Sequence, residues 1–345
     1  MSRPILRISR GQFRENIAAV QRRITPSVLM LVMKDDAYGH GLGWAVEEAA
    51  EAGVSWFGGY DVPTALRIRR ALSVGERVFA WATSTDGEIA EALMHEVDLG
   101  IGTAEYLRRV IARARALGRR ARVHLKIDSG LRRNGVLPAD WDAFVAEART
   151  AEDEGALEIV GVWSHLSEAS DAEDDASQEV FLAAVDAVRR AGGAPELLHL
   201  TASAASWWRP ELRGSISRIG AFCYGIRSAD GPELDGIRPI AALTAPVVGI
   251  DGEDAIVGIG SFDGLPSSLS GVEVGTPVGP RLLRVIGQTT SVVAGWSGMQ
   301  RGEQVTVFGP GEQGEQSATA LAERIGTVGE EILTRLTPRV RRVIV

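Results

Sequence analysis

A lysine that follows a buried apolar run is the residue with the clearest chemical potential in this sequence. The run Val28-Leu-Met-Leu-Val-Met33 is followed directly by Lys34-Asp-Asp-Ala-Tyr-Gly-His-Gly41. A lysine at the end of a buried strand is costly unless it is paired or reactive. At such a place it can form a Schiff base with a carbonyl cofactor. The glycines and the Tyr38 hydroxyl that follow suit close approach to a phosphate.

This segment resembles the cofactor-lysine motif of the alanine racemase family, Lys-x-Asp-Ala-Tyr-Gly-His-Gly. The match has one free position and is specific; a purely structural lysine is the alternative. The resemblance implies that pyridoxal 5′-phosphate (PLP) is bound through a Schiff base to Lys34, with Tyr38 near its phosphate. It also implies an isomerase that acts on a small amino acid.

The resemblance continues in two segments that would lie beside the cofactor ring. The run from His124 to Val136 looks like the family's His-x-Lys-x-Asp-Thr-Gly-Met-x-Arg-x-Gly, which implies that Arg133 lies near the cofactor's phenolic oxygen and the substrate carboxylate. Lys126 matches a lysine that is carbamylated in some members; a barrel lysine paired with a carboxylate is the alternative. His165, in Trp-Ser-His, matches the histidine beside the pyridine ring, and a satisfied core histidine is the alternative.

Two later segments resemble the parts of the family that hold the phosphate and the pyridine nitrogen. His199-Leu-Thr-Ala-Ser203-Ala-Ala resembles His-x-Ala-Asn-Ser-Ala-Ala, so Ser203 is expected to hydrogen-bond the phosphate at a helix start; an N-cap that serves only its helix is the alternative. Arg218-Ile-Gly-Ala-Phe-Cys-Tyr-Gly225 resembles Arg-Pro-Gly-Ile-x-x-Tyr-Gly. The resemblance implies that Arg218 donates to the pyridine nitrogen, and that Gly220 and Ala221 offer backbone N–H groups to the phosphate. An arginine at that nitrogen opposes its protonation, which favours reversible proton transfer.

The last third of the chain departs from the family pattern. In the family, a tyrosine from the partner subunit is the base on the face opposite the lysine, in a segment like Gly-Tyr-x-Asp-Gly-Tyr-Pro. Here Ile259-Gly-Ser-Phe-Asp-Gly-Leu-Pro266 has Ser261 at the tyrosine position, and a serine is a poor acid or base without an activating partner. The family's Met-Asp pair reads Ile286-Gly287, its phosphate-contacting tyrosine reads Glu330, and its Ser-Tyr-Gly stretch is missing. These changes indicate that the half of the site donated by the partner is rebuilt.

Short apolar runs indicate the elements that must position these residues. Eight runs are expected as strands: 28–33, 56–57, 78–81, 97–101, 123–127, 159–163, 197–200 and 216–222. Apolar residues at three- and four-residue spacing predict helices at 44–52, 62–72, 103–117, 141–151 and 176–191. The alternation predicts an α/β fold with an N-terminal, TIM-like β/α barrel, whose chemistry lies at the C-terminal ends of the strands. A doubly wound sheet is the alternative.

The pattern changes after Tyr224. From Arg238 onward, short apolar runs punctuated by glycine predict a mostly-β domain, with one helix at 318–325 and a last strand near 340–345. We therefore expect a PLP-binding barrel at residues 1–230 and a C-terminal β domain at residues 237–345, with a linker at 226–236. It remains open whether residues 1–9 pack with the second domain.

Composition narrows the class of protein. The chain has 345 residues, 45% of them hydrophobic and 24% charged, which is typical of a globular protein with two domains. Its net charge of −8 disfavours a nucleic-acid partner. The single cysteine, Cys223, suits a reducing compartment. No signal peptide or membrane-length apolar run is evident, so we expect a cytoplasmic protein with no membrane partner. We also expect no metal site.

Three functions remain open. The first is racemisation at Cα of alanine or another small amino acid, with an altered second base, by a homodimer with a shared active site. The second keeps PLP and runs another reaction at Cα, such as one-face epimerisation or aldol-type cleavage. The third is a PLP-binding protein with little turnover. The presence of Arg133, which a carrier would not need, ranks an enzyme first.

Overall fold

The chain, described by a computed structural model over residues 3–73 and 75–345, divides into two compact units. Unit 1 comprises the described residues up to Ala19, Asp35–Gly41 and Ala221–Val345, and unit 2 comprises Val20–Lys34 and Leu42–Gly220. The last passage between the units follows Gly220, shortly before the segment 226–236 that the sequence suggests as a linker.

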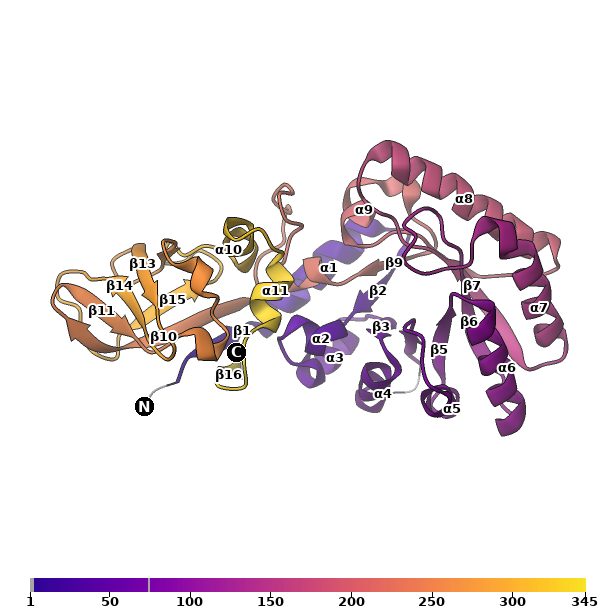
Figure 1. Cartoon of the computed structure of the whole chain (residues 1–345), viewed down its shortest axis with the longest axis horizontal. Helices are drawn as coiled ribbons and strands as arrows, with labels where there is room; N and C mark the ends of the chain where they lie inside the picture. The colour runs from indigo at the N-terminus through magenta and orange to yellow at the C-terminus, as the bar shows by residue number, and fades with distance from the viewer. Residues whose placement is uncertain (1–2, 74) are drawn as a thin grey trace. The chain divides into compact units, whose positions relative to one another are not determined.

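Unit 2 is built on eight parallel strands (Figure 1), in the order β8-β7-β6-β5-β4-β3-β2-β9. The strands are β2 (Val28–Val32), β3 (Trp56–Tyr60), β4 (Arg77–Ala80), β5 (Val97–Ile101), β6 (Ala121–Lys126), β7 (Leu157–Trp163), β8 (Leu197–His199) and β9 (Ile216–Ile219). Seven of them run in the chain order that a β/α barrel requires, and β9 returns to pair with β2. The predicted TIM-like barrel is confirmed.

Side-chain and backbone hydrogen bonds link the two end strands, β8 and β9, so that the barrel is nearly closed. The Ser215 hydroxyl accepts from the Leu198 amide at 2.8 Å and donates to the Glu196 carbonyl at 3.2 Å. The Arg218 amide donates to the Thr201 carbonyl at 3.3 Å. The eighth strand is shorter than expected, because the chain turns into a 3₁₀ helix, η3 (Ala221–Tyr224), instead of continuing as a strand to Phe222.

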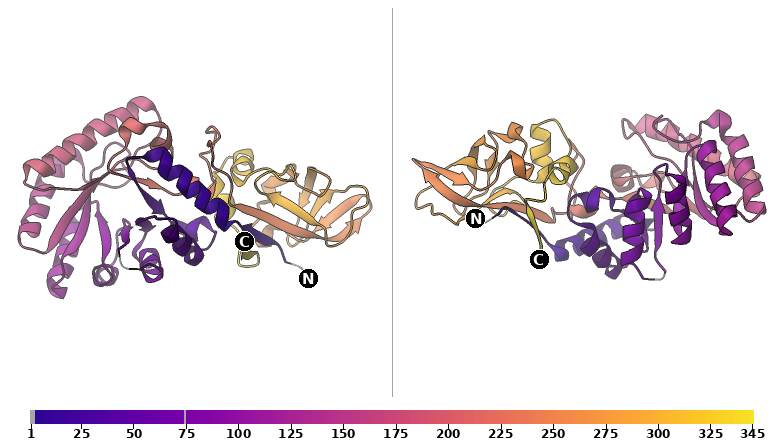
Figure 2. Two further views of the ribbon diagram at one scale, coloured as in Figure 1. Left: turned by 180° about the vertical axis from the view of Figure 1, so that it is seen from behind. Right: turned by 60° about the horizontal axis from the view of Figure 1, so that its bottom comes forward.

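Helices surround these strands in each view (Figure 2). They are α3 (Leu42–Glu51), α4 (Val62–Ala71), α5 (Asp86–Met94), α6 (Ala104–Leu117), α7 (Trp141–Asp153), α8 (Asp171–Arg190) and α9 (Ser203–Trp208), and α1 (Arg10–Ile24) precedes the first barrel strand. The sequence prediction missed α1 and α5. In α5 a signal was present, because Thr85 and Glu88 form a capping box.

The barrel interior is filled by large side chains that point inward from different strands. Met30, Trp56, Phe79, Trp163 and Ile216 form one buried cluster. Such residues explain why the strands read as nearly continuous apolar runs, since both faces of each strand are covered. The same interior also contains buried polar side chains, described below.

Most of unit 1 is an eight-stranded sheet in the order β12-β13-β14-β11-β10-β1-β16, with β15 paired to β10. The strands are β1 (Ile5–Ile8), β10 (Ala241–Asp251), β11 (Asp254–Val257), β12 (Glu273–Val274), β13 (Arg281–Ile286), β14 (Ser291–Ala294), β15 (Gln304–Phe308) and β16 (Arg341–Ile344). The helices α10 (Ala318–Arg324) and α11 (Gly329–Thr334) follow β15. The N-terminal β1 pairs antiparallel with β10 and parallel with β16, so residues 5–8 belong to this sheet. The mostly-β C-terminal domain is confirmed.

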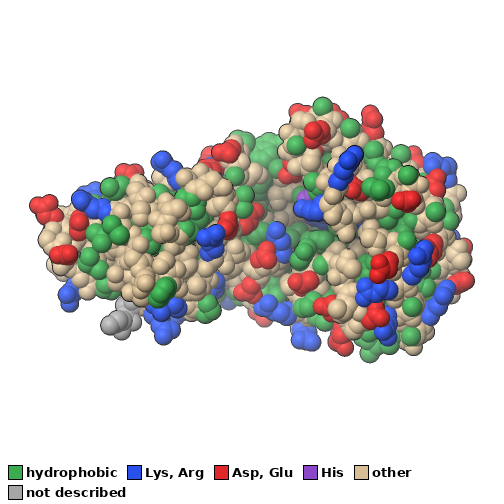
Figure 3. All heavy atoms as spheres, in the orientation of Figure 1, with side chains coloured by type: hydrophobic (Ala, Val, Ile, Leu, Met, Phe, Trp, Pro, Cys, Tyr) green, Lys and Arg blue, Asp and Glu red, His purple; other side chains and the backbone are tan. Residues whose placement is uncertain are grey.

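None of the helices in the described part of the chain is long and apolar enough to span a membrane. The face drawn in Figure 3 carries acidic and basic side chains interspersed over both units. That face therefore has no continuous basic area of the kind that binds nucleic acid.

Candidate active site

Lys34 lies at the start of a left-handed turn, at the C-terminal end of β2. The four residues after it, Asp35 to Tyr38, have φ values of 53°, 55°, 56° and 52°. Left-handed backbone costs an L-residue roughly 1–2 kcal/mol, and it clusters at functional sites when the surroundings hold it. Here the Gly39 and Gly41 amides donate to the Asp35 and Asp36 carbonyls at 2.8 and 2.9 Å. The turn therefore fixes where the chain goes immediately after Lys34.

The loop after Lys34 is also anchored within unit 1. Arg342 of β16 donates from Nε to the Gly39 carbonyl at 2.6 Å. Gly39 has φ +79°, and a Cβ added there would lie 2.8 Å from the Leu333 carbonyl oxygen. Both its conformation and its surroundings therefore require glycine at position 39.

Arg218, on β9, is buried and held by several acceptors. Its Nη1 donates to the His199 carbonyl at 2.7 Å and lies 3.1 Å from His199 Nδ1. Its Nη2 donates to the Ser164 carbonyl at 2.7 Å and lies 3.1 Å from Nδ1 of His165. Burial lowers the pKa of Arg218 to about 9, so the guanidinium stays charged at neutral pH. The side chain is thus a fixed cation whose orientation the surrounding strands determine.

His165, after β7, is neutral and surrounded by cations. Burial, together with the charges of Arg218, Arg133, Lys126 and Lys34, lowers its pKa to about 3. Because guanidinium groups only donate, Nδ1 of His165 accepts from Arg218 and the ring proton is on Nε2. His165 is therefore a poor base at neutral pH. The four cations around it form a region that favours anionic ligands, such as a phosphate and a carboxylate.

Lys126, the last residue of β6, lies in this cationic region and is 4% exposed. Its Nζ is 4.4 Å from the centre of the Trp163 ring. Burial and the charges of Arg218 and Arg133 lower its pKa to about 8, while Asp128 opposes them. Asp128 Oδ1 accepts from the backbone amides of Gly130 and Arg132, and no ion pair to Lys126 occurs among the described residues. The carboxylate that acts on Lys126 is therefore already held by backbone amides, and the lowered pKa leaves a fraction of the amine uncharged at neutral pH.

Ser203 is the first residue of α9, after β8. The N-cap is Ala202, which provides no side-chain cap, so Ser203 does not act as a simple N-cap. Its Oγ accepts from the Gly220 amide at 3.4 Å. Glu168, whose pKa is raised mainly by burial, accepts from the Ala205 amide at 2.8 Å. The Ser203 hydroxyl, after β8, and the Gly220 amide, after β9, are thus neighbours in unit 2.

In unit 1, Tyr38 is buried and its ring centre is 5.1 Å from that of Tyr224. Burial raises its pKa, and the charge of Glu330 on α11 raises it further. A backbone hydrogen bond with Ala221 opposes this shift. Tyr38 therefore keeps its proton and can donate a hydrogen bond. Glu330 lies close enough to act on Tyr38, although the sequence alignment expected a tyrosine at that place.

Ser261, which the sequence analysis aligned with the family tyrosine, lies on the surface of unit 1. Ser261 begins a 3₁₀ helix, η4 (Ser261–Asp263), and is exposed, while the adjacent Phe262 is 52% exposed. Their amides donate to the carbonyls of Gly287 and Gln288, each at 2.9 Å. The altered segments at 261 and at 286–287 are therefore neighbours, and their changes belong to one region.

The comparisons with known proteins agree with this geometry along the whole chain. The family model "Alanine racemase, N-terminal domain" matches residues 8–228, and "Alanine racemase, C-terminal domain" matches residues 249–344. The chain belongs to the alanine racemase family. It is thus a PLP-dependent isomerase, and its cofactor is PLP.

The relatives include two curated alanine racemases. That of Thermobifida fusca is 34% identical over 95% of this chain and 94% of the relative, and that of Frankia casuarinae is 33% identical over 95% and 93%. Among solved structures, the alanine racemase of Streptomyces coelicolor has a TM-score of 0.93 at 30% identity and covers 99% of this chain and 98% of its own. That of Bartonella henselae, which is 18% identical and so similar in fold alone, carries covalently bound pyridoxal phosphate.

The residues of this chain fit PLP. A dianionic phosphate and a carboxylate-bearing substrate suit the cationic region around His165, and Lys34 offers an amine beside it. The sequence analysis missed the polar side chains inside the barrel, His124, His199 and Asp98. One signal was available, because Asp98 interrupts the apolar run Val97–Ile101.

Proposed function

We propose that this member of the alanine racemase family acts at Cα of a small amino acid with a second catalytic base unlike the family tyrosine. The proposal rests on one contrast between the two units. Unit 2 keeps the cationic region around His165, whereas the tyrosine position in unit 1 is occupied by Ser261. The first feature supports binding of cofactor and substrate, and the second removes a proton carrier.

The binding roles follow from charge and donor chemistry. Arg133 is exposed among the cations around His165 and suits the substrate carboxylate, which a guanidinium binds through two parallel hydrogen bonds. The Ser203 hydroxyl and the backbone amides of Gly220 and Ala221 suit the phosphate. Within unit 1, Tyr38 stays protonated and so keeps a hydroxyl that can donate.

The proton-transfer roles are divided between the two faces of Cα. When bound, PLP supplies an electron sink that makes the Cα–H bond acidic. Lys34 Nζ removes the proton from its own face and returns it there. Arg218, charged at neutral pH, suits the pyridine nitrogen and opposes protonation of that atom, which favours return of the proton over deeper chemistry.

The opposite face lacks an obvious base. A serine hydroxyl titrates far from neutral pH, and His165, with a pKa near 3 and Nδ1 engaged by Arg218, is a poor substitute. Exchange of the α-proton with retention should therefore be faster than inversion. A second candidate is an enzyme confined to one face, which the same contrast favours. Arg133 argues against a carrier with little turnover.

The proposal includes a homodimer with a shared site, which is typical of the family and gives a two-fold arrangement. The exposure of Ser261 and of the large apolar Phe262 supports a covering subunit at this surface. A cytoplasmic location stays part of the proposal on the basis of the lone, buried Cys223.

The test is NMR of small L- and D-amino acids in D2O with the PLP-loaded enzyme. We expect loss of the α-proton signal for at least one small amino acid, with inversion slower than exchange. If no amino acid exchanges its α-proton although PLP is bound, the proposal of an enzyme acting at Cα is wrong. If inversion keeps pace with exchange, an efficient second base is present.

A further inference from the structure

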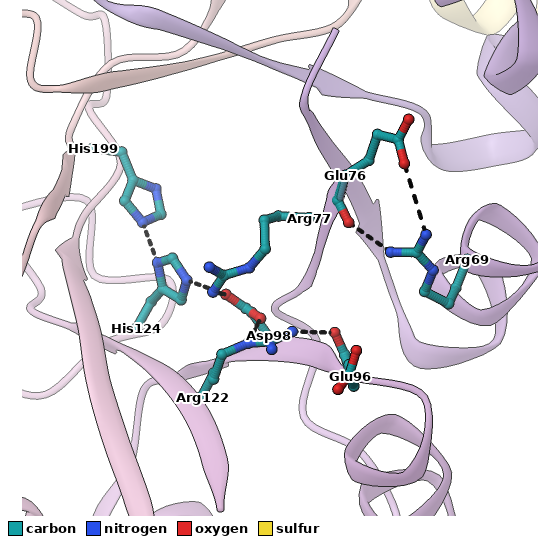
Figure 4. Close-up of polar contacts among 8 residues, drawn as sticks. All are labelled: Arg69, Glu76, Arg77, Glu96, Asp98, Arg122, His124 and His199. Atoms are coloured by element: carbon teal, nitrogen blue, oxygen red, sulfur yellow. Dashed lines mark hydrogen bonds and ion pairs between the residues drawn. The ribbon is translucent and has the colours of Figure 1, made fainter. Parts of the chain in front are cut away.

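A chain of buried polar side chains crosses the barrel interior from Arg218 to Asp98. Figure 4 shows three of its members, His199, His124 and Asp98. Arg218 Nη1 is 3.1 Å from His199 Nδ1, His199 Nε2 is 2.9 Å from His124 Nδ1, and His124 Nε2 is 3.2 Å from Asp98 Oδ2. Both imidazoles and Asp98 are fully buried, and Arg218 is 4% exposed. The side chains come from β9, β8, β6 and β5 of one unit.

The two ends of the chain fix the direction of every hydrogen bond in it. A guanidinium has only donors and an ionised carboxylate has only acceptors. His199 must then accept at Nδ1 and carry its proton on Nε2. That proton is donated to His124 Nδ1, so His124 also carries its proton on Nε2 and donates it to Asp98. Only this assignment satisfies all three contacts.

The charges agree with neutral imidazoles between two ions. Burial lowers the pKa of both histidines. Burial alone would raise the pKa of Asp98, but the hydrogen bond from His124 and the charges of Arg122 and Arg77 hold it below its ordinary value. A second proton on His124 would make two N–H groups face each other across the 2.9 Å contact between the rings. A second proton on His199 would place an Nδ1–H against the Arg218 guanidinium, 3.1 Å away. The arrangement therefore excludes a charged imidazole while both ends stay ionised.

Two arginines at the N-terminal end of the strands hold Asp98. Arg77 Nη2 and Arg122 Nε donate to its two carboxylate oxygens, each at 2.6 Å (Figure 4). Arg77 begins β4, and Asp98 and Arg122 are the second residues of β5 and β6. A buried ion pair contributes little net stability compared with well-packed apolar residues, because desolvation offsets the attraction. Stability therefore does not explain why a carboxylate is buried here.

We propose that Asp98 is a positioning residue that holds Arg218 from the opposite end of the barrel. Its negative charge fixes both histidine tautomers, which leaves His199 Nδ1 as an acceptor for the Arg218 guanidinium. The consequence for catalysis rests on the proposed function, since it concerns Arg218 at the cofactor ring. The tautomers themselves do not depend on that function.

A purely structural role is the competing explanation. The His199 ring lies nearly parallel to the Trp163 ring, with an interplanar angle of 7° and ring centres 5.7 Å apart. The ring centres of His124 and Phe79 are 4.6 Å apart. Rings that merely fill the barrel would need no particular tautomer. The tautomers therefore separate the two explanations.

The experiment is ¹⁵N NMR of the histidine rings in the PLP-loaded enzyme, which has five histidines. In the wild type, His124 and His199 should both carry the proton on Nε2. In Asp98→Leu, His124 Nε2 faces only arginine donors, so Nδ1–H should appear on both rings, and His199 Nδ1 should then no longer accept from the Arg218 guanidinium. Glu76→Leu is the matched control. The Glu76 carboxylate lies 4.0 Å from Arg69 Nη2 at the same end of the barrel, and the Glu76 backbone carbonyl accepts from Arg69 Nη1 at 2.6 Å. Glu76 is outside the histidine chain, so both rings should keep the wild-type tautomer.

Asp98→Asn, which preserves shape, tests the inference if Asp98→Leu fails to fold. An amide leaves one acceptor atom for the three donors of His124, Arg77 and Arg122. In part of the molecules the amide N–H should therefore face His124 Nε2, and an Nδ1–H signal should appear on both rings. The inference is overturned if His199 carries the proton on Nδ1 in the wild type, or if an Asp98 variant that folds keeps only Nε2–H on both rings.

The activity readout separates this inference from the proposed function. In a folded Asp98 variant, α-proton exchange should fall by roughly 10- to 100-fold, by analogy with outer-shell residues that orient metal ligands, and Glu76→Leu should not change it. If the tautomers are as expected but the enzyme exchanges no α-proton, the proposed function is wrong and the inference about Asp98 and the tautomers still holds. A switched tautomer with undiminished exchange contradicts the positioning role alone.

Discussion

The backbone amide of Ser261 donates to the carbonyl of Gly287 at 2.9 Å, which joins two positions at which this chain departs from the family pattern. The contact is backbone to backbone, so it does not depend on either side chain. A substitution at either position therefore leaves this contact in place. Restoring one side chain alone would leave the other altered.

Lys34 should be the only lysine that holds the cofactor. The purified protein should be yellow, and borohydride should attach the cofactor irreversibly to Lys34, as peptide mass spectrometry would show. Lys34→Ala should lose both properties, whereas Lys126→Ala, at the nearby buried lysine, should keep them. Labelling of any lysine other than Lys34 would contradict the assignment.

The effect of a substitution in the left-handed turn after Lys34 on the stability of the protein should depend on how well the new residue adopts a positive φ. Asp35 is exposed and has φ 53°. Asp35→Val should destabilise the protein by about 1–2 kcal/mol relative to Asp35→Gly, because a β-branched residue is strained at positive φ and glycine is not. Urea unfolding of the two variants measures the difference. Equal stabilities would show that this turn is not left-handed in solution.

Sequence reasoning predicted the barrel strands because each is a compact apolar run, and it singled out Lys34 because β/α barrels carry chemistry at strand ends. His165 and Ser203 came from the resemblance to the family motifs. It did not predict the chain from Arg218 to Asp98. That chain depends on side chains from four strands that meet only inside the closed barrel. The position of Glu330 near Tyr38 likewise depends on packing between α11 and the loop after Lys34 within unit 1.

Lys126 should react with carbon dioxide. Burial and two nearby arginines lower its pKa to about 8, so the free-amine fraction rises as pH increases through that value. A carbamate would replace a disfavoured cation with an anion between Arg133 and Arg218, which favours the modified form. With ¹³C-bicarbonate, NMR should show a carbamate signal that grows between about pH 7 and 9 and is absent in Lys126→Ala. A wild type without this signal would show that the amine stays unmodified.

The chain should form a homodimer. Light scattering is expected to give twice the chain mass of 36.8 kDa. Phe262, which is 52% exposed on unit 1, should become protected from solvent in the dimer, and Phe262→Ser should weaken association. If the wild-type protein stays monomeric at every workable concentration, the prediction of a homodimer with a shared active site is wrong.

Inversion of alanine should be slow, and the residue at position 261 should be a main cause. Inverting Cα requires removal of a proton on one face and delivery on the other, and Lys34 can reach only one face. General acid–base groups contribute typically 10²–10⁴-fold, so loss of the tyrosine should cost a few kcal/mol of barrier, at about 1.4 kcal/mol per tenfold. Exchange with retention should survive better.

The deciding comparison is wild type against Ser261→Ala, with L-alanine and D-alanine in separate samples in D2O, following exchange and inversion for each enantiomer. Both proteins should exchange the α-proton at similar rates, because that step belongs to Lys34, and both should invert slowly. Ser261→Tyr is expected to restore inversion only in part, because Ile286 and Gly287 have also changed the surroundings. Fast inversion by the wild type that persists in Ser261→Ala would mean that another residue supplies the second base, and the proposal for position 261 would then be wrong.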